Sequence, residues 1–246
     1  VVLVAGFQGV SRTKEITTLG RGGSDTTAVA LACALKADRC EVLTDVEGMY
    51  SADPRFIKTA RRYKKLSLEL ALTMATQGAQ VMHPRSLEIA RANGLPLWVG
   101  HAAENKKDLG TEIVPVNQMN VSELPKVVSV VKREGLTLFA VSDGAAATRV
   151  CELMATHRPL IHHFESQNQK LTLALDPTES AAFIAAAKLT QGQPASLVSL
   201  VGYHLEQEGT LVSRVLEILK KEQLGSDLRL TTETHSIKIW LLGESR

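Results

Sequence analysis

The feature that most restricts the fold of this chain is a regular alternation, within residues 1–116, of short apolar runs and segments with helical spacing. The runs have the length of buried strands, and the segments between them repeat apolar residues every three or four positions, as amphipathic helices do. Strands that alternate with helices are typical of an α/β domain with a mostly parallel sheet and helices on both faces. The expected strands are 1–5, 39–44 and 97–99, and the expected helices are 25–35, 66–77 and 85–92.

The second half of the chain has a different pattern. The polar stretch 117–125 ends in a proline and predicts a domain boundary. Two rounds follow, each in the order strand, Gly-containing loop, helix, strand, strand, which indicates a weak internal repeat of a small α+β unit. A turn at Arg133-Glu134-Gly135 is expected between the first two strands. The expected strands are 127–131, 136–141, 160–165, 171–175, 197–202, 228–232 and 237–242, and the expected helices are 145–155, 179–189 and 211–221.

Charge and composition narrow the classes of partner. The chain has 246 residues, with 28 Lys and Arg against 26 Asp and Glu and no basic arm or acidic tail, so nothing favours a nucleic-acid partner. No apolar run approaches the roughly 20 residues of a membrane span. Cys33, Cys40 and Cys151 lack a C-x-x-C spacing, which suits a reducing compartment, and without a signal-peptide pattern we expect a cytoplasmic protein. Because residue 1 is Val within an expected strand, we expect the chain to begin inside a larger protein.

A glycine-rich stretch, Gly20-Arg21-Gly22-Gly23-Ser24-Asp25, leads directly into the first expected helix. Glycine lets the backbone approach a ligand and take positive φ, and successive N–H groups at a helix start attract anions. Arg21 offers two parallel hydrogen bonds to a carboxylate or phosphate, and Asp25 can orient a lysine or a metal ion or accept a proton. A tight strand-to-helix turn capped by Ser24 or Asp25 explains the glycine content equally well. The spacing matches neither G-x-x-x-x-G-K-[ST] nor G-x-G-x-x-G.

Two further loops follow an expected strand or lie at a strand edge. The stretch Thr44–Arg55 (TDVEGMYSADPR) comes directly after a strand, at the carboxyl end of the sheet where α/β proteins bind ligands. It combines acidic residues, a flexible glycine, an aromatic ring and an arginine; an ordinary loop with a turn at Asp53-Pro54 is the alternative. In the loop 78–84, His83 is expected to be a hydrogen-bonded structural residue. His162-His163 lies in an expected strand, whose side chains alternate between faces, and this is poor geometry for joint metal binding.

The strings TTLGRGGSD, TDVEGMYSADPR and GAQVMHPRSLEIA occur in this order along the chain. Together they resemble the carboxyl-terminal part of the catalytic domain of aspartate kinases, which belong to the amino-acid kinase family. The resemblance implies that residues 1–118 are the C-terminal part of an amino-acid kinase domain. Residues 126–246 resemble two α+β ACT-like regulatory domains in tandem, the second lacking its last helix.

The resemblance implies transfer of the γ-phosphoryl group of ATP to the β-carboxylate of L-aspartate, giving 4-phospho-L-aspartate on the route to lysine, threonine and methionine. In that family the residue matching Asp25 is the catalytic carboxylate, which organises the lysine that steadies the transferring phosphoryl group. Mg²⁺ would come with the nucleotide, and no residue is assigned to a separate metal. By position, the amino-acid substrate would be bound by Arg21, Gly22, Gly23 and Ser24. The ATP site would be lined by Thr44, Asp45, Tyr50, Ser51, Ala52, Asp53, Pro54 and Arg55.

The sequence also departs from the family pattern. Gln80 stands where the family usually has a lysine near the nucleotide, so Gln80 is not counted as a site residue. The family's N-terminal lysine-glycine turn is missing here, which keeps two alternatives open: a non-catalytic regulatory or assembly module, and a kinase of the same fold for another acid. The loop Ser142–Ala145 is shorter than the family's effector loop, so the sequence does not specify an amino-acid effector. Because ACT-like domains usually pair edge to edge, we expect a homodimer or a larger assembly.

Overall fold

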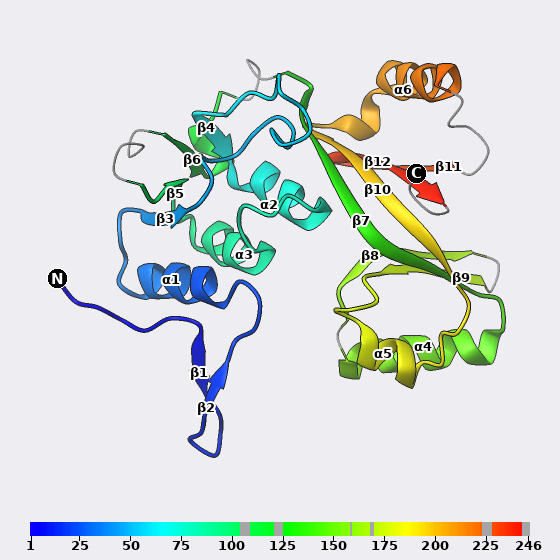
Figure 1. The fold of residues 1–246 in the computed structure, drawn as a ribbon, viewed down its shortest axis with the longest axis horizontal. Coiled ribbons are helices and arrows are strands. Elements are labelled where there is room, and N and C mark those ends of the chain that lie inside the picture. Colours follow the sequence, from blue (N-terminus) through cyan, green and yellow to red (C-terminus); the bar gives the residue numbers. More distant parts are fainter. Residues whose placement is uncertain (104–108, 121–124, 158, 168–169, 223–227, 243–246) are drawn as a thin grey trace. The chain divides into compact units, whose positions relative to one another are not determined.

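The computed structural model describes residues 1–103, 109–120, 125–157, 159–167, 170–222 and 228–242 (Figure 1). These residues form two compact units, each described by itself. The first consists of Val1–Val131, Leu200–Leu205 and Thr234–Ser236, and the rest of the described chain forms the second. Part of the predicted boundary, residues 121–124, lies outside the described residues.

The first unit contains a four-stranded mixed sheet in the order β3 (Cys40–Thr44), β5 (Leu97–His101), β6 (Gly110–Val114), β4 (Lys65–Ser67). The β3–β5 and β4–β6 pairs are parallel, but β5 and β6 are antiparallel. The sheet is therefore less uniformly parallel than predicted. Strand β6 was not predicted; the connection from His101 to Gly110 is shorter than a parallel crossover needs, and β6 returns alongside β5 in the antiparallel sense.

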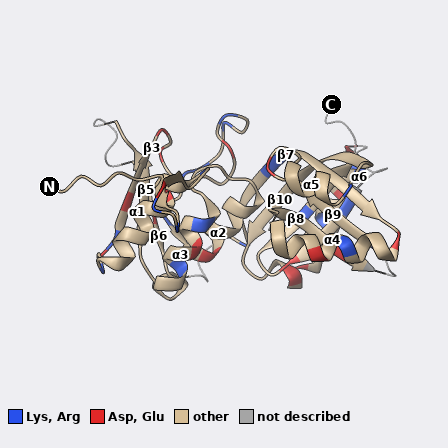
Figure 2. Ribbon diagram, turned by 90° about the horizontal axis from the view of Figure 1, so that it is seen from below, with Lys and Arg blue, Asp and Glu red and all other residues tan. Residues whose placement is uncertain are grey.

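Three helices cover one face of this sheet: α1 (Gly23–Ala34), α2 (Leu68–Gln77) and α3 (Pro84–Asn93), as Figure 2 also shows. Val29, Leu87 and Val99 are fully buried in the core between the helices and the sheet. On β3 the exposed residues Glu41 and Leu43 alternate with more buried ones, and Leu43 is 59% exposed. Among the described residues the three helices thus pack on one face of this sheet, which differs from the predicted helices on both faces.

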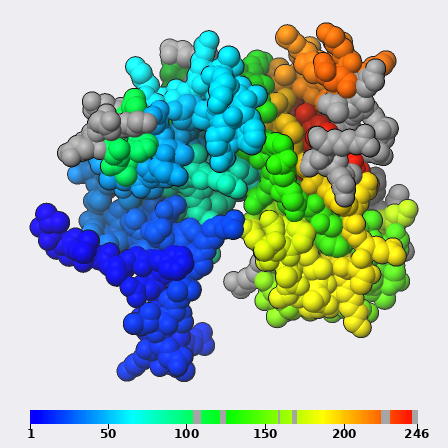
Figure 3. Space-filling view, in the orientation of Figure 1, coloured from blue at the N-terminus to red at the C-terminus, as the bar shows by residue number. Residues whose placement is uncertain are grey.

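The segment before α1 differs from its prediction. Residues 1–6 form no regular structure, although their apolar composition predicted a strand. A strand needs a hydrogen-bonded neighbour, which composition alone does not supply. The segment that follows forms an unpredicted antiparallel hairpin, β1 (Gln8–Val10) with β2 (Ile16–Thr18). Figure 3 shows this segment standing out from the body of the first unit in dark blue.

A six-stranded sheet, in the order β11-β12-β10-β7-β9-β8, forms the base of the second unit. Each of the two predicted rounds supplies three of its strands, and the β7–β9 and β8–β9 pairs are antiparallel. The strands are β7 (Val127–Val141), β8 (Ile161–Gln167), β9 (Lys170–Leu175), β10 (Gly192–Gly202), β11 (Leu228–Glu233) and β12 (Ser236–Leu242). The helices of this unit are α4 (Gly144–His157), α5 (Ala181–Ala186) and α6 (Gly209–Lys221). Short 3-10 turns lie at Val116–Gln118, in the first unit, and at Leu205–Gln207.

Strand β7 organises the packing of the second unit. The predicted turn at Arg133-Glu134-Gly135 is wrong, because Gly135 takes a φ of +74° without interrupting the strand. Neighbouring residues of β7 face opposite sides of the sheet: Phe139 packs in a core with Phe183 of α5, and Leu138 packs in another with Trp240. Both faces of the sheet therefore carry a hydrophobic core.

Candidate functional site

The glycine-rich turn is shaped by close contacts that only glycine permits. Gly22 is the N-cap of α1 and has φ +70° and ψ 12°, in the left-handed region. A Cβ atom built on Gly22 would lie 2.2 Å from the Cβ of His83. A Cβ on Gly23 would lie 2.8 Å from the Cβ of Leu19 and 3.0 Å from the ring of Phe7. The backbone is thus enclosed on two sides where it enters the helix.

The turn delivers backbone donors to the start of α1. The N–H of Thr26 donates to the carbonyl of Gly22 over 3.0 Å, which opens the helical ladder, and no side chain caps the helix. The predicted caps are therefore wrong: Ser24 and Asp25 lie inside the first turn. First-turn N–H groups have no acceptor within the helix and form an anion site at the positive end of its dipole. Arg21 is exposed on the same turn.

His83 forms a rigid support beside Gly22. Its Nδ1 accepts a hydrogen bond from the N–H of Arg85 over 3.2 Å, which caps α3, and Pro84 occupies the first turn of that helix. The carbonyl of His83 accepts hydrogen bonds from the N–H of Ser86 (3.1 Å) and from its hydroxyl (2.7 Å). His83 is hydrogen-bonded, as expected, but its contact with the glycine turn was missed. Gln80, in the same loop, is exposed.

The loop after β3 leaves the sheet at the carboxyl ends of two parallel strands. Thr44 is in register with His101, and its carbonyl accepts a hydrogen bond from the N–H of Ala102 over 2.8 Å. The hydroxyl of Thr44 donates to Asp45 over 3.0 Å. Further along, Gly48 has φ +123° and passes Thr111 so closely that a Cβ would lie 2.5 Å from its hydroxyl oxygen. The loop is therefore anchored to the sheet at both its start and its middle.

Tyr50 and Ser51 hold the centre of this loop in place. Tyr50 forms an isolated antiparallel bridge with Arg62, and its hydroxyl donates to Glu47 over 3.0 Å. Burial, followed by this hydrogen bond, raises the pKa of Tyr50. Ser51 exchanges hydrogen bonds with Arg61: its N–H donates to the Arg61 carbonyl (2.9 Å), and its hydroxyl accepts from the Arg61 N–H (3.0 Å). The side chains that follow are thus presented from a fixed backbone.

The end of the loop carries a tight ion pair around Pro54. The guanidinium of Arg55 contacts both carboxylate oxygens of Asp53, at 2.7 to 3.0 Å, and also lies 6.0 Å from the ring centroid of Phe56. Hydrogen bonds from Arg55 lower the pKa of Asp53. The Nε and Nη2 atoms of Arg55 are used in this pair.

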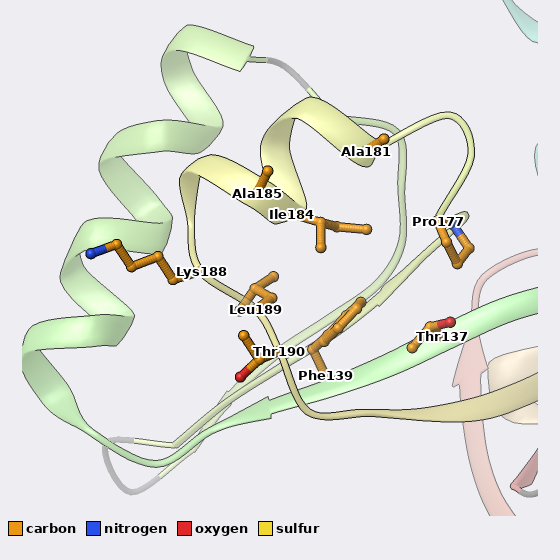
Figure 4. Close-up of a pocket in the computed structure, with 9 residues that line it drawn as sticks. All are labelled: Thr137, Phe139, Pro177, Ala181, Ile184, Ala185, Lys188, Leu189 and Thr190. Atoms are coloured by element: carbon orange, nitrogen blue, oxygen red, sulfur yellow. The ribbon is translucent and has the colours of Figure 1, made fainter.

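The structure brings some of the predicted residues together. It places Arg21 to Asp25 at the start of α1, beside His83, and Thr44 to Arg55 in the loop from β3 to β4. That both loops enclose one substrate pair remains a prediction. A hollow of about 530 Å³ lies elsewhere, in the second unit, lined by apolar side chains such as Phe139 and Ile184 (Figure 4). None of the predicted site residues lines it.

Comparison with known proteins shows which family the chain resembles. Residues 1–101 match the model of the amino acid kinase family. The aspartokinase of Geobacillus stearothermophilus is 56% identical over 107 residues, covering 44% of this chain and 26% of that protein. The aspartate kinase of Pseudomonas putida is 34% identical over 252 residues, covering 95% of this chain and 61% of that protein.

Solved structures extend the similarity along the chain. Escherichia coli aspartokinase III in complex with aspartate and ADP (R-state) is 26% identical with a TM-score of 0.81, over 97% of this chain and 56% of that one. The same enzyme in complex with lysine and aspartate (T-state) is 27% identical with a TM-score of 0.68. Over its first 101 residues the chain matches the amino acid kinase family, and along nearly its whole length it is similar in sequence and fold to aspartokinases. It spans between about a quarter and three-fifths of the curated relatives named here.

Proposed function

We propose that this chain is part of an aspartate kinase, which transfers the γ-phosphoryl group of ATP to the β-carboxylate of L-aspartate. The observation that carries the proposal is the glycine turn, in which Gly22 and Gly23 are enclosed so closely that a side chain has no room. The exposed Arg21 directly precedes these glycines, and α1 begins at Gly23. A carboxylate oxygen of aspartate attacks the γ-phosphorus, the bond to ADP breaks, and 4-phospho-L-aspartate and ADP result. This reaction is the first step toward lysine, threonine and methionine.

The proposed roles follow from charge. Phosphoryl transfer between two anions depends on positioning and on cations or N–H donors near the transferring group. Arg21 holds a carboxylate of aspartate, and Gly22, Gly23 and Ser24 line the same site at the positive end of α1. The N–H of Gly23 donates to the carbonyl of Gly20, so the first-turn amides that follow it are the ones assigned to the anion. Asp25 cannot bind that anion directly, so its role is to orient a cation beside the phosphoryl group.

ATP is assigned to the loop after β3. The predicted contacts come from Thr44 and Asp45 at the sheet edge and from the segment Tyr50–Arg55, whose backbone is held by Arg61 and Arg62. Mg²⁺ would accompany the nucleotide, because it is usually held by one or two carboxylates together with substrate phosphates. Asp45 is the exposed carboxylate nearest the sheet edge in this loop. Among the described residues, no group of three His, Cys, Asp or Glu side chains is placed to hold a metal ion.

The second unit is proposed to be regulatory. A relative of this chain binds lysine in its T-state complex, and we extend an amino-acid effector and a homodimer or larger assembly to this chain by that similarity. Within the described residues, no helix has both the length and the apolar character to cross a bilayer.

The test is formation of aspartyl phosphate, trapped with hydroxylamine, by the full-length protein and by this chain alone. Arg21→Ala and Asp25→Ala should each reduce kcat/KM by at least about a hundredfold, by the scale of lost transition-state stabilisation. Arg39→Ala and Asp38→Ala are matched controls, because both residues are exposed in the connection between α1 and β3, and they should leave turnover unchanged. Unchanged turnover in both site variants would remove these assignments.

Two outcomes would favour the alternatives. Lysine or threonine binding by calorimetry, without any turnover by the full-length protein, would indicate a regulatory or assembly module. Turnover of glutamate or another small acid in preference to aspartate would indicate a kinase of the same fold with a different substrate.

A further inference from the structure

The side chain of His83 fills the space that a side chain on Gly22 would need. A Cβ on Gly22 would lie 2.2, 2.3 and 2.6 Å from the Cβ, Cγ and Cδ2 atoms of His83, the closest approach of the imidazole to the glycine turn. Residues 22 and 83 are far apart in sequence and belong to the starts of two different helices, α1 and α3. The imidazole therefore forms one wall of the turn.

This wall cannot easily move. Nδ1 of His83 is held by the N–H of Arg85, and its carbonyl is held twice by Ser86. Pro84 fixes the backbone that follows, since its ring restricts φ. The hydrogen bond at Nδ1 also sets the orientation of the ring. His83 thus has one ring nitrogen committed to α3, and its ring edge lies against the turn that begins α1.

The opposite side of the turn is also closed. Gly23 lies against Leu19 and Phe7, and the N–H of Gly23 donates to the carbonyl of Gly20 over 3.1 Å. His83 thus encloses the turn at Gly22, which has left-handed φ and ψ, and Leu19 and Phe7 enclose it at Gly23. That conformation decides where the first-turn amides of α1 point.

We propose that His83 is a positioning residue for the acidic substrate: its imidazole holds the turn at Gly22 so that the first-turn amides of α1 and Arg21 converge on the substrate carboxylate. The inference rests on the proposed function, because it assigns the anion at this turn to L-aspartate. His83 acts through Gly22 and touches no reacting atom. Its loss therefore affects the affinity for aspartate and leaves the affinity for ATP nearly unchanged.

Two substitutions separate this role from helix capping. His83→Ala removes the acceptor for the N–H of Arg85 but keeps the Cβ that lies closest to Gly22, whereas His83→Gly removes both. His83→Gly should raise KM for aspartate about tenfold, in the range that small misplacement of a binding group costs, with KM for ATP within about twofold, and His83→Ala should raise KM for aspartate less. Both variants should lower the melting temperature, because both lose the cap of α3. Ser67→Ala, which removes the cap of α2, is the control for lost capping and should leave KM for aspartate unchanged.

A measurement that does not depend on turnover tests the contact between His83 and Gly22. Hydrogen exchange at the amides of Gly23, Ser24 and Asp25 should be at least about tenfold faster in His83→Gly than in the parent, because the turn opens more often. Gly22→Ala should lose less melting temperature in the His83→Gly background than in the parent, since both the Cβ and the ring of His83 are gone. Absence of aspartate turnover in the parent would overturn the proposed function. Turnover with an unchanged KM in both His83 variants would overturn the positioning role, and unchanged exchange together with additive melting temperatures would overturn the contact.

Discussion

Gly22→Ala tests how the glycine turn is built, and its cost follows from two separate terms. The left-handed conformation at φ +70° costs an alanine about 1–2 kcal/mol. The overlap at 2.2 Å with the Cβ of His83 adds an overpacking cost of about 1–3 kcal/mol, because that atom is close to the backbone and cannot swing away. The sum, about 2–5 kcal/mol, is a large share of the 5–15 kcal/mol that stabilises an ordinary domain.

The turn supplies its own control. Gly20 has φ +77° but nothing within 4 Å of a built Cβ, and Gly94, at the end of α3, has φ +63° and is equally open. Gly20→Ala and Gly94→Ala therefore carry the conformational term alone. At about 2–4 °C per kcal/mol, thermal unfolding should lose roughly 2–8 °C in each control and roughly 4–20 °C in Gly22→Ala. Equal losses in all three variants would refute the contact between Gly22 and His83.

Three further predictions concern other parts of the molecule. Burial, followed by the charge of the neighbouring Arg133, lowers the pKa of His162 to about 4. The stability that neutral His162 provides is therefore complete above about pH 6.5 and is lost as the pH falls toward 4. The melting temperatures of the parent and of His162→Gln should converge over that pH interval. In Arg55→Ala the pKa of Asp53 should rise toward its ordinary value, as measured by carbon NMR titration. In the parent, the stability that the ionised Asp53 contributes is present at neutral pH and is lost as the pH falls through its lowered pKa. Tyr203→Phe removes a 2.7 Å hydrogen bond to the hydroxyl of Ser67, the N-cap of α2, and should lower the free energy of unfolding by about 1 kcal/mol in denaturant titration. An unchanged free energy of unfolding would show that this hydrogen bond makes no net contribution to stability.

The sequence predicted those elements whose signals are local. Helix α3 was expected to stop at Asn93-Gly94, and it ends at Asn93 with Gly94 in the left-handed region. The glycine-rich stretch was expected to lead into a helix, and it does. Its cap was misassigned because Ser24 and Asp25 are strong capping residues, whereas the cap is Gly22, selected by space and by positive φ.

Elements that depend on distant partners were harder to predict. Residues 1–5 are as apolar as a buried strand, but pairing decides whether a strand forms, and here they form none. Arg133-Glu134-Gly135 has turn composition, yet β7 runs unbroken from Val127 to Val141 with a neighbouring strand on each side, β10 and β9. The contact of His83 with Gly22 joins positions far apart in the chain, so no local pattern indicates it. The sequence linked Gly22 and His83 only in that each lies in a motif shared with aspartate kinases.

The most direct test of the central claim is a titration of this chain with L-aspartate, followed by the backbone amide NMR signals of Gly22, Gly23 and Ser24. If the turn binds the substrate carboxylate, these three signals shift together and saturate, and Arg21→Ala abolishes the shift while Arg39→Ala does not. Signals that stay in place while others move, or that move equally in Arg21→Ala, would contradict it.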